Sequence, residues 1–240
     1  DSPFLNRTMC AYSVGSVFKP LVAAAALTQG ESESRLYESK GYAQVGDRIY
    51  YCHRHVGHGV LNMRQAIEQS CNPYFIDLVQ DTGCQQILSL AAAVGFGVPE
   101  ELAPGYEIAA GTLPSTESLK SRGEQANFAF GQGELTATPI QLAQLYCTIA
   151  NGGLQVRPRL VASFTEDGES VYGNLPISGG ERILDEAVAG QVASFLAGVV
   201  AEGTGASAQP AHYHAAGKTG SAQTGQMEAG PGGQKEEIIH

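Results

Sequence analysis

Three short strings of residues in this sequence have the types and the spacing that acyl transfer through a serine hydroxyl requires. Ser16 precedes Lys19 by three positions. Residues three apart are neighbours on a helix, so the Lys19 amine is placed to take the proton of the Ser16 hydroxyl. The second string is Ser70-Cys71-Asn72, and the third is Lys218-Thr219-Gly220. Together they predict a serine nucleophile with a lysine base.

Short patterns occur by chance, so the order and number of these strings matter more than any one of them. Each string occurs once in the sequence. All three in this order have a chance expectation on the order of one in a thousand. The conjunction therefore indicates a functional site.

The three strings resemble the S-x-x-K, S-x-N and K-[ST]-G signatures of the penicillin-binding transpeptidases and serine β-lactamases. Flanking segments extend the likeness over nearly the whole chain and resemble the class B, monofunctional transpeptidases. These segments are Tyr12–Pro20, Gly131–Gln141, Glu202–Gly205 and Gly217–Gln223.

The resemblance implies a role for each matching residue. Ser16 attacks a peptide carbonyl, Lys19 is its base, and Ser70 relays the proton to the leaving amine. Burial and the nearby Lys218 charge are expected to lower the pKa of Lys19, which acts as a base only when neutral. The catalytic residues are thus predicted to be Ser16, Lys19, Ser70 and Lys218.

The same resemblance implies substrate-binding roles. Asn72 holds the substrate amide and orients Lys19, while Lys218, Thr219 and Ser221 offer donors to a substrate carboxylate. Gly220 leaves a strand edge open, so that an extended peptide can pair with it. The backbone N–H groups of Ser16 and Ser221 are expected to form an oxyanion hole.

The implied fold class is α+β, with a helical lobe at about 20–153 and an antiparallel sheet lobe at about 154–240. Apolar spacing and turn residues predict helices over 20–27, 63–70, 74–81, 85–94, 139–150 and 186–200. Strands are expected at 159–164 and 170–172, around a turn at Asp167-Gly168, and at 214–223, which carries Lys218. An exposed loop is expected at 225–234, and Tyr172-Gly173-Asn174 is interpreted as a turn.

Both ends favour a fragment of a longer protein. Members of the family carry a further domain and sheet strands before the nucleophile, and two strands and a helix after the third motif. Only 20 residues follow Gly220 here. The family's membrane anchor is also missing from this sequence, whose longest apolar run, Leu21–Leu27, is too short to span a bilayer. The resemblance places the full-length protein at the extracytoplasmic face of the cell membrane, in a cell-wall synthesis complex.

Composition excludes one class of partner. The formal net charge is −10, and only 14 Lys and Arg residues are scattered along the chain. Nucleic-acid phosphates are bound by clustered basic residues, so no nucleic-acid partner is expected.

The five cysteines leave at least one thiol unpaired within the chain. Cys71 lies inside the second motif and Cys52 stands 19 residues upstream, so we hypothesise a redox-sensitive Cys52–Cys71 disulfide. The loop that contains Cys52, His53, His55 and His58 brings four possible zinc ligands together within a short stretch of sequence. A surface loop without metal is favoured, and no metal or cofactor is predicted.

The resemblance implies a serine D,D-transpeptidase that acts on peptidoglycan stem peptides ending in D-Ala-D-Ala and is acylated by β-lactams. A β-lactamase or DD-carboxypeptidase is the first alternative. The sequence has no E-x-x-L-N string to carry a deacylating glutamate, and its gap of 148 residues between Ser70 and Lys218 is long for a β-lactamase. A non-catalytic β-lactam sensor domain is the second alternative.

Overall fold

The computed structural model describes residues 5–103, 105–161, 164–166, 169–172, 180–229 and 235–239. Seven α-helices lie within these ranges, with bounds Lys19–Thr28 (α1), Met63–Glu68 (α2), Asn72–Thr82 (α3), Gln85–Val94 (α4), Arg122–Ala129 (α5), Pro139–Ala150 (α6) and Glu186–Ala201 (α7). Short 3-10 helices span Arg7–Met9 (η1), Gly15–Phe18 (η2), Ser118–Lys120 (η3) and Ala206–Ala208 (η4).

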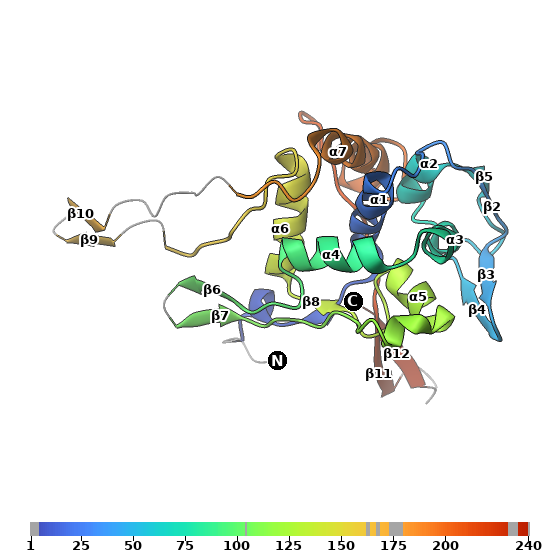
Figure 1. The fold of residues 1–240 in the computed structure, drawn as a ribbon, viewed down its shortest axis with the longest axis horizontal. Helices are drawn as coiled ribbons and strands as arrows, with labels where there is room; N and C mark the ends of the chain where they lie inside the picture. The colour runs from blue at the N-terminus through green and yellow to red at the C-terminus, as the bar shows by residue number, and fades with distance from the viewer. Residues whose placement is uncertain are drawn as a thin grey trace.

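Helix α1 is the centre of the core. Pro20 occupies its first turn, where a missing N–H costs nothing, and every residue from Lys19 to Ala26 is buried. A helix that is apolar on all sides must be covered on all sides, and α2, α3, α4 and α7 all contact it (Figure 1). The small alanine side chains of α1 let these neighbouring helices approach closely. This packing fixes the position of the residues at the start of α1.

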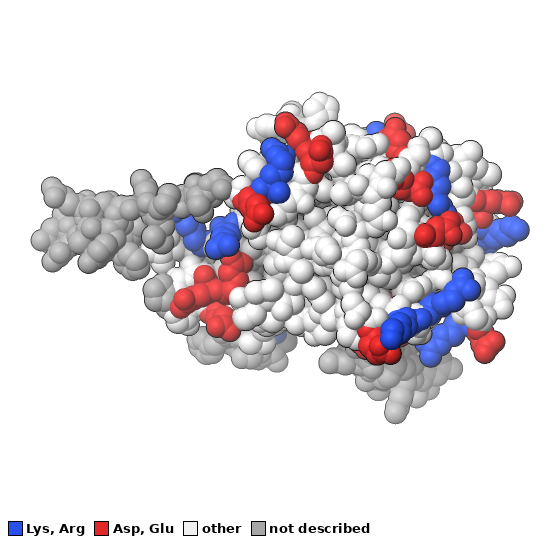
Figure 2. Space-filling view, viewed as in Figure 1, with Lys and Arg blue, Asp and Glu red and all other residues white. Residues whose placement is uncertain are grey.

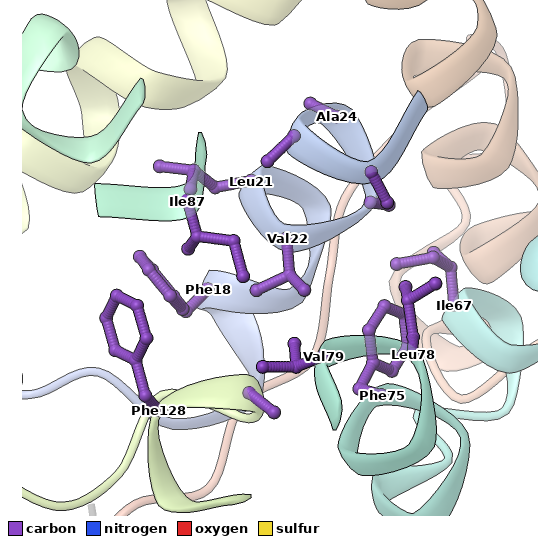
Figure 3. Packing of buried hydrophobic residues seen from close by; sticks show 14 of the residues in the cluster. Phe18, Leu21, Val22, Ala24, Ile67, Phe75, Leu78, Val79, Ile87 and Phe128 are labelled. Atoms are coloured by element: carbon purple, nitrogen blue, oxygen red, sulfur yellow. The ribbon is translucent and has the colours of Figure 1, made fainter. Parts of the chain in front are cut away.

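Aromatic and branched side chains pack the core around the start of α1. Phe18 lies with its ring centroid 5.3 Å from that of Phe128 and 6.1 Å from that of Phe96. In Figure 3, Phe18 and Leu21 face Ile87 of α4 and Phe128 of α5. A close-packed interior resists small displacements, so the residues just before α1 are held rigidly.

The second motif lies at a break between α2 and α3. Asn62 caps α2 by a reciprocal hydrogen-bond pair with Gln65, and α2 ends at Glu68. Ser70 then adopts a left-handed φ of 52°, which is costly for a residue with a Cβ. Cys71 caps α3, and Asn72 begins it. The sequence predicted a break at 71–73 between helices over 63–70 and 74–81. In the structure α3 already begins at Asn72, and the chain reverses at Ser70.

All strands among the described residues form antiparallel pairs. The pairs are β1 (Tyr12–Ser13) with β8 (Thr136–Ala137), β2 (Tyr37–Ser39) with β5 (Gly59–Leu61), β3 (Tyr42–Val45) with β4 (Arg48–Tyr51), β6 (Glu100–Ala103) with β7 (Tyr106–Ile108), β9 (Phe164–Glu166) with β10 (Glu169–Tyr172), and β11 (Gln223–Ala229) with β12 (Lys235–Ile239). Helices and antiparallel pairs together confirm the α+β class. The division into lobes at residue 153 stays a prediction.

The hairpin expected around 167–168 is confirmed by the pairing of Glu169 with Glu166, but its first strand begins at Phe164, so the strand expected over 159–164 is wrong for residues 159–161. Its tip, 167–168, and residues 173–174 of the predicted Tyr172-Gly173-Asn174 turn lie outside the described residues.

Two predictions about the C-terminal region are wrong. Residues 214–222 form no strand, and β11 begins only at Gln223. The predicted strand had nothing to pair with in the described chain, because this segment lies against η2 and α7 instead of against another strand. The loop expected over 225–234 is occupied up to Ala229 by β11, which pairs with β12. Residues 230–234 lie outside the described residues.

Charged side chains are spread around the visible face in Figure 2, with both signs interspersed over its rim. Arg35 illustrates the mixing, since its guanidinium contacts Glu31, Asp77 and Asp81. On the described part of this face, basic side chains stand next to acidic ones. Among the described residues, no helix is long and apolar enough to cross a membrane.

Candidate active site

Ser16 lies in η2, directly before α1, as the sequence predicts. The turn depends on Gly15, which has a φ of 63° and donates its N–H to the carbonyl oxygen of Gly131 over 2.7 Å. A Cβ on Gly15 would stand 2.6 Å from the carbonyl oxygen of Ser221. Only glycine allows the nucleophile's turn to lie this close to the segment that follows the third motif.

Lys19 is fully buried, and its amine meets the groups of both the first and second motifs. Its Nζ lies 3.0 Å from the Oγ of Ser16. It also donates to the carbonyl oxygen of Ser70 over 2.8 Å and to the Oδ1 of Asn72 over 2.6 Å. These acceptors hold the amine in line with the Ser16 hydroxyl, so the predicted pairing of nucleophile and base is present in space.

Burial and, to a smaller extent, the positive charge of Lys218 together lower the pKa of Lys19 to about 7. An amine with this pKa is neutral in about half of the molecules at pH 7, and the neutral form has a lone pair available. When Lys19 is neutral, the Ser16 hydroxyl can donate to Nζ over the same short distance. Lys19 can therefore act as a base near neutral pH, whereas an ordinary surface lysine, with a pKa of 10.5, is protonated there.

Ser70 lies between the two lysines. Its Oγ is 2.8 Å from the Nζ of Lys218 and 3.2 Å from the Nζ of Lys19. Burial lowers the pKa of Lys218 to about 8. The left-handed backbone of Ser70 turns both its carbonyl and its hydroxyl toward the amines, which gives a reason for the strain at this residue.

Asn72 connects the base to the strand hairpin beside the site. Its Oδ1 accepts from Lys19, and its Nδ2 donates to the carbonyl oxygen of Tyr51 at the end of β4 over 3.2 Å. A donor at one end, the Lys19 amine, and an acceptor at the other, the Tyr51 carbonyl, fix which end of the amide faces which group.

The third motif contacts the site without regular secondary structure. The N–H of Gly217 donates to the carbonyl oxygen of Leu196 in α7 over 3.1 Å, and the Thr219 hydroxyl lies 2.7 Å from that of Thr204. A Cβ on Gly220 would stand 2.8 Å from the Cγ1 of Val17. The strand expected to carry Gly220 is not formed, and the close approach to Val17 is a further reason for a residue without a Cβ; the pairing of Gly220 with a substrate peptide stays a prediction.

Two cavities open on either side of Ser16. The first, of about 350 Å³, is lined by Ser16, His53, Ser70, Asn72, Thr204, Thr219, Gly220 and Ser221. The second, of about 340 Å³, is lined by Ser16, Ile49, Tyr50, Tyr51, Asn72, Phe130, Gln132 and Ser221. Asn72, Thr219, Gly220 and Ser221, which were predicted to bind substrate, all line the first cavity, whereas Lys218 is not among its lining residues.

Sequence reasoning missed the other lining residues. Thr204 and Gln132 lie in segments that carry the family likeness, and His53 was considered only as a zinc donor, but none of the three was predicted to line the site. The aromatic and β-branched residues of Arg48–Tyr51 were a usable strand signal, but nothing in them indicated nearness to Ser16.

The cysteines of the disulfide hypothesis lie close together behind the site. The Sγ atoms of Cys52 and Cys71 and a ring nitrogen of His58 are all within 4.8 Å of one another, and both thiols are free. A hydrogen bond between the thiols lowers the pKa of Cys52 and raises that of Cys71. The disulfide stays a prediction that this proximity permits. Within the described ranges, His53 and His55 are not part of this cluster.

A buried lysine beside a serine, with a second serine and a second lysine next to them, is the arrangement of a serine acyl-transfer enzyme. The comparisons with known proteins agree. The family model of the penicillin binding protein transpeptidase domain matches residues 1–239, and the chain belongs to this family.

Curated relatives include stage V sporulation protein D of Bacillus subtilis, 32% identical over 231 residues, which are 93% of this chain and 35% of that protein. Peptidoglycan D,D-transpeptidase MrdA of Acinetobacter baumannii is 29% identical over 240 residues, which are 96% of this chain and 36% of that protein. These relatives confirm the class B likeness. The chain spans about a third of their length.

Solved structures share the fold. The D,D-transpeptidase domain of a peptidoglycan glycosyltransferase from Eggerthella lenta matches with a TM-score of 0.84 and 28% identity, over 100% of this chain and 59% of that one. Penicillin-binding protein A of M. tuberculosis, as its penicillin G acyl-enzyme complex, matches with a TM-score of 0.78 and 26% identity, over 92% of this chain and 50% of that one.

Proposed function

We propose that this chain performs the acyl transfer of a peptidoglycan D,D-transpeptidase, through an acyl-enzyme on Ser16. One observation carries the proposal: the Nζ of the fully buried Lys19 lies 3.0 Å from the Ser16 Oγ, and its pKa is lowered to about 7. A serine hydroxyl needs such a base to attack a carbonyl at neutral pH.

In the acylation step, Ser16 Oγ forms a bond to the carbonyl carbon of the penultimate D-alanine while its proton passes to Lys19. The backbone N–H groups of Ser16 and Ser221 bind the developing oxyanion. The C–N bond to the terminal D-alanine then breaks. Its nitrogen takes a proton through Ser70, which lies within hydrogen-bond distance of both lysines.

In the second step an acceptor amine takes the place of the departed D-alanine. It attacks the ester carbonyl, gives its proton back along the Ser70 route, and releases Ser16 as a new amide bond forms. The same groups serve both directions because the acceptor retraces the path of the leaving amine.

The terminal carboxylate of the donor is recognised by the third motif. Lys218 contributes a positive charge, and the hydroxyls of Thr219 and Ser221 contribute donors on the wall of the first cavity. A β-lactam carries a carboxylate and a reactive amide in the same relation, so it is expected to acylate Ser16.

Hydrolysis as the main activity is disfavoured by the lining of the site. A β-lactamase needs a group that activates water for deacylation. None of the described residues that line the two cavities is Asp or Glu. The ester on Ser16 is therefore expected to persist until an amine arrives.

For the whole protein we propose a membrane-anchored enzyme at the extracytoplasmic face of the bacterial membrane, within a cell-wall synthesis complex. Its role would be to cross-link stem peptides that end in D-Ala-D-Ala. The support is the membership of the chain in the transpeptidase family.

The proposal is tested by incubating the protein with a fluorescent penicillin and following the covalent adduct over time. We expect a long-lived adduct that is lost in Ser16→Ala and retained in Ser34→Ala, an exposed serine remote from the motifs. Absence of an adduct would overturn the proposal, and decay within a turnover would favour a β-lactamase. A stable adduct without D-alanine release from a D-Ala-D-Ala peptide would indicate a sensor domain.

A further inference from the structure

Thr204 lines the first cavity but has no part in the roles assigned so far. Its hydroxyl oxygen lies 2.7 Å from that of Thr219, which is the usual distance for a hydrogen bond between two hydroxyls. Resting on the proposed function, we propose that Thr204 is a positioning residue. Its hydroxyl donates to that of Thr219 and so directs the Thr219 proton at the terminal carboxylate of the acyl donor.

The direction of this hydrogen bond follows from what Thr219 must do. A carboxylate only accepts hydrogen bonds, so Thr219 has to give it its single hydroxyl proton. The Thr219 oxygen is then left as an acceptor, and the hydroxyl that stands 2.7 Å away is that of Thr204. Thr204 is therefore the donor of the pair when a carboxylate is bound. A hydroxyl that accepts one hydrogen bond also donates a stronger one, because the two bonds polarise each other.

The turn around Thr204 holds its side chain in a constant place. The N–H of Thr204 donates to the carbonyl oxygen of Glu68, at the end of α2, over 3.0 Å. The next residue, Gly205, donates its N–H to a carbonyl oxygen of α7 over 2.9 Å. The preceding residue lies so close to α2 that a Cβ on Gly203 would stand 2.4 Å from the same Glu68 oxygen. The turn is thus fixed to two helices, and Thr204 is the one residue of the three that has a side chain.

Thr219 lies on a segment without regular secondary structure, so its position depends on contacts such as this one. Its carbonyl oxygen accepts a hydrogen bond from the Nζ of Lys218 over 3.0 Å. Its hydroxyl meets Thr204 and no other protein group among the described residues. The two contacts hold different parts of Thr219, because the lysine fixes the backbone and Thr204 fixes the rotation of the hydroxyl.

These hydrogen bonds join the second and third motifs in a closed ring. The Nζ of Lys218 connects the Ser70 hydroxyl to the Thr219 carbonyl oxygen. The two threonine hydroxyls connect Thr219 to Thr204. The Thr204 N–H then leads to Glu68, two residues before Ser70 in the chain. Replacing the Thr204 side chain leaves its N–H bond intact, so the effect should fall on the Thr219 hydroxyl and not on Ser70 or the lysine.

The experiment measures the binding of substrate separately from the reaction. Ser16→Ala is the background, because no acyl-enzyme can form in it. NMR titration gives the dissociation constants of acetyl-D-Ala-D-Ala and of the same peptide with a C-terminal amide. Thr204→Val keeps the shape of the side chain and removes the hydroxyl, so it should weaken the binding of the carboxylate peptide about fivefold, the effect of one hydrogen bond. Thr204→Ser should restore that affinity. The amide peptide should lose less than about twofold, because a neutral acceptor makes a weaker bond.

A second substitution separates positioning from direct contact with the substrate. In Thr219→Val no hydroxyl is left to position, so adding Thr204→Val should cause no further loss of affinity. Thr116→Val is the matched control, because Thr116 is exposed and does not line the cavity. Unchanged affinity in Thr204→Val, an equal loss for the two peptides, or a further loss in the double variant would overturn the inference.

Failure of the proposed function gives a different pattern. In that case the chain with Ser16 intact forms no penicillin adduct and releases no D-alanine. The binding comparison still decides the inference, because it is made without acylation. Conversely, an active chain whose Thr204→Val and Thr204→Ser variants bind the carboxylate peptide equally well overturns the inference alone. If neither peptide binds to Ser16→Ala, Thr219 receives no carboxylate and the inference fails.

Discussion

The two sides of the active site are built differently. The helical side carries Ser16, Lys19 and Ser70 on η2, α1 and the break before α3, and its lysine is completely buried. The C-terminal side carries 217–221 on a segment without regular secondary structure, in which Thr219, Gly220 and Ser221 are exposed. Bond-making groups need a fixed position and a perturbed pKa, whereas binding groups need access to substrate. The difference supports the proposed division of roles, in which the nucleophile and its base lie on the first side and the groups that receive the substrate carboxylate lie on the second.

The largest effect is expected on the helical side. Lys19→Met keeps the volume of the side chain and removes the base, so acylation by penicillin should fall by about 10³-fold. Stopped-flow labelling would measure this rate. Lys40→Met is the control, because the Lys40 side chain is 66% exposed and should change nothing. Retention of more than a tenth of the rate by Lys19→Met would place the base elsewhere.

The next effect links the two sides. Lys218→Met removes a positive charge that lowers the pKa of Lys19, so that pKa should rise. The rising limb of the pH–rate profile should then move to higher pH, and affinity for carboxylate-bearing substrates should fall by about tenfold or more. Kinetics with a carboxylate-containing penicillin across pH would detect both. An unmoved limb would mean that burial alone sets the pKa of Lys19.

The helical side was largely predictable from sequence. The predicted bounds of α4 and α6 agree with the structure at both ends. Local signals set them, because Gly95 ends α4 and Thr138 and Pro139 start α6. The spacing of Ser16 and Lys19 likewise predicted their contact. Such features depend on neighbours within one or two turns.

Features set by long-range contacts were missed. Helix α5 has little apolar periodicity, and the β3–β4 hairpin was missed although its two-residue turn, Gly46-Asp47, is a hairpin signal. The strand predicted over 214–223 failed because the segment lies on Val17 and Leu196 rather than on another strand. The walls of the second cavity come from segments 80 residues apart, Ile49–Tyr51 and Phe130–Gln132, and sequence spacing cannot indicate such a meeting.

A smaller effect is expected on the C-terminal side. Gly220→Ala places a methyl group 2.8 Å from the Cγ1 of Val17, so the segment must shift outward. We expect this overpacking to cost about 1 kcal/mol, which would lower the affinity for substrate about fivefold. The rate of the chemical step at saturating substrate should change little. Saturation kinetics separates the two quantities. Gly190→Ala, where no atom lies within 4 Å of the new methyl group, serves as the control. A fall confined to the saturated rate would contradict the division of roles.

The smallest effect concerns Cys52 and Cys71. The negative charge that this pair carries on Cys52 raises the pKa of Lys19, so joining the two thiols in a disulfide should shift the rising limb of the pH profile slightly to lower pH. Mild oxidation with diamide, followed by peptide mapping, should show the two thiols joined. Cys71→Ser should remove both the bond and the shift. Free thiols at both positions after oxidation would end the hypothesis.

The central claim is that Lys19 acts as a neutral base on Ser16. It is tested most directly by the pH dependence of the second-order rate constant for acylation by penicillin. The account predicts a bell-shaped profile, because Lys19 loses its proton near pH 7 and becomes a base, whereas Lys218 loses its binding charge near pH 8. The two apparent values belong to the interacting pair of lysines. A rate that rises only near the ordinary lysine pKa of 10.5, or that is independent of pH, would contradict the account.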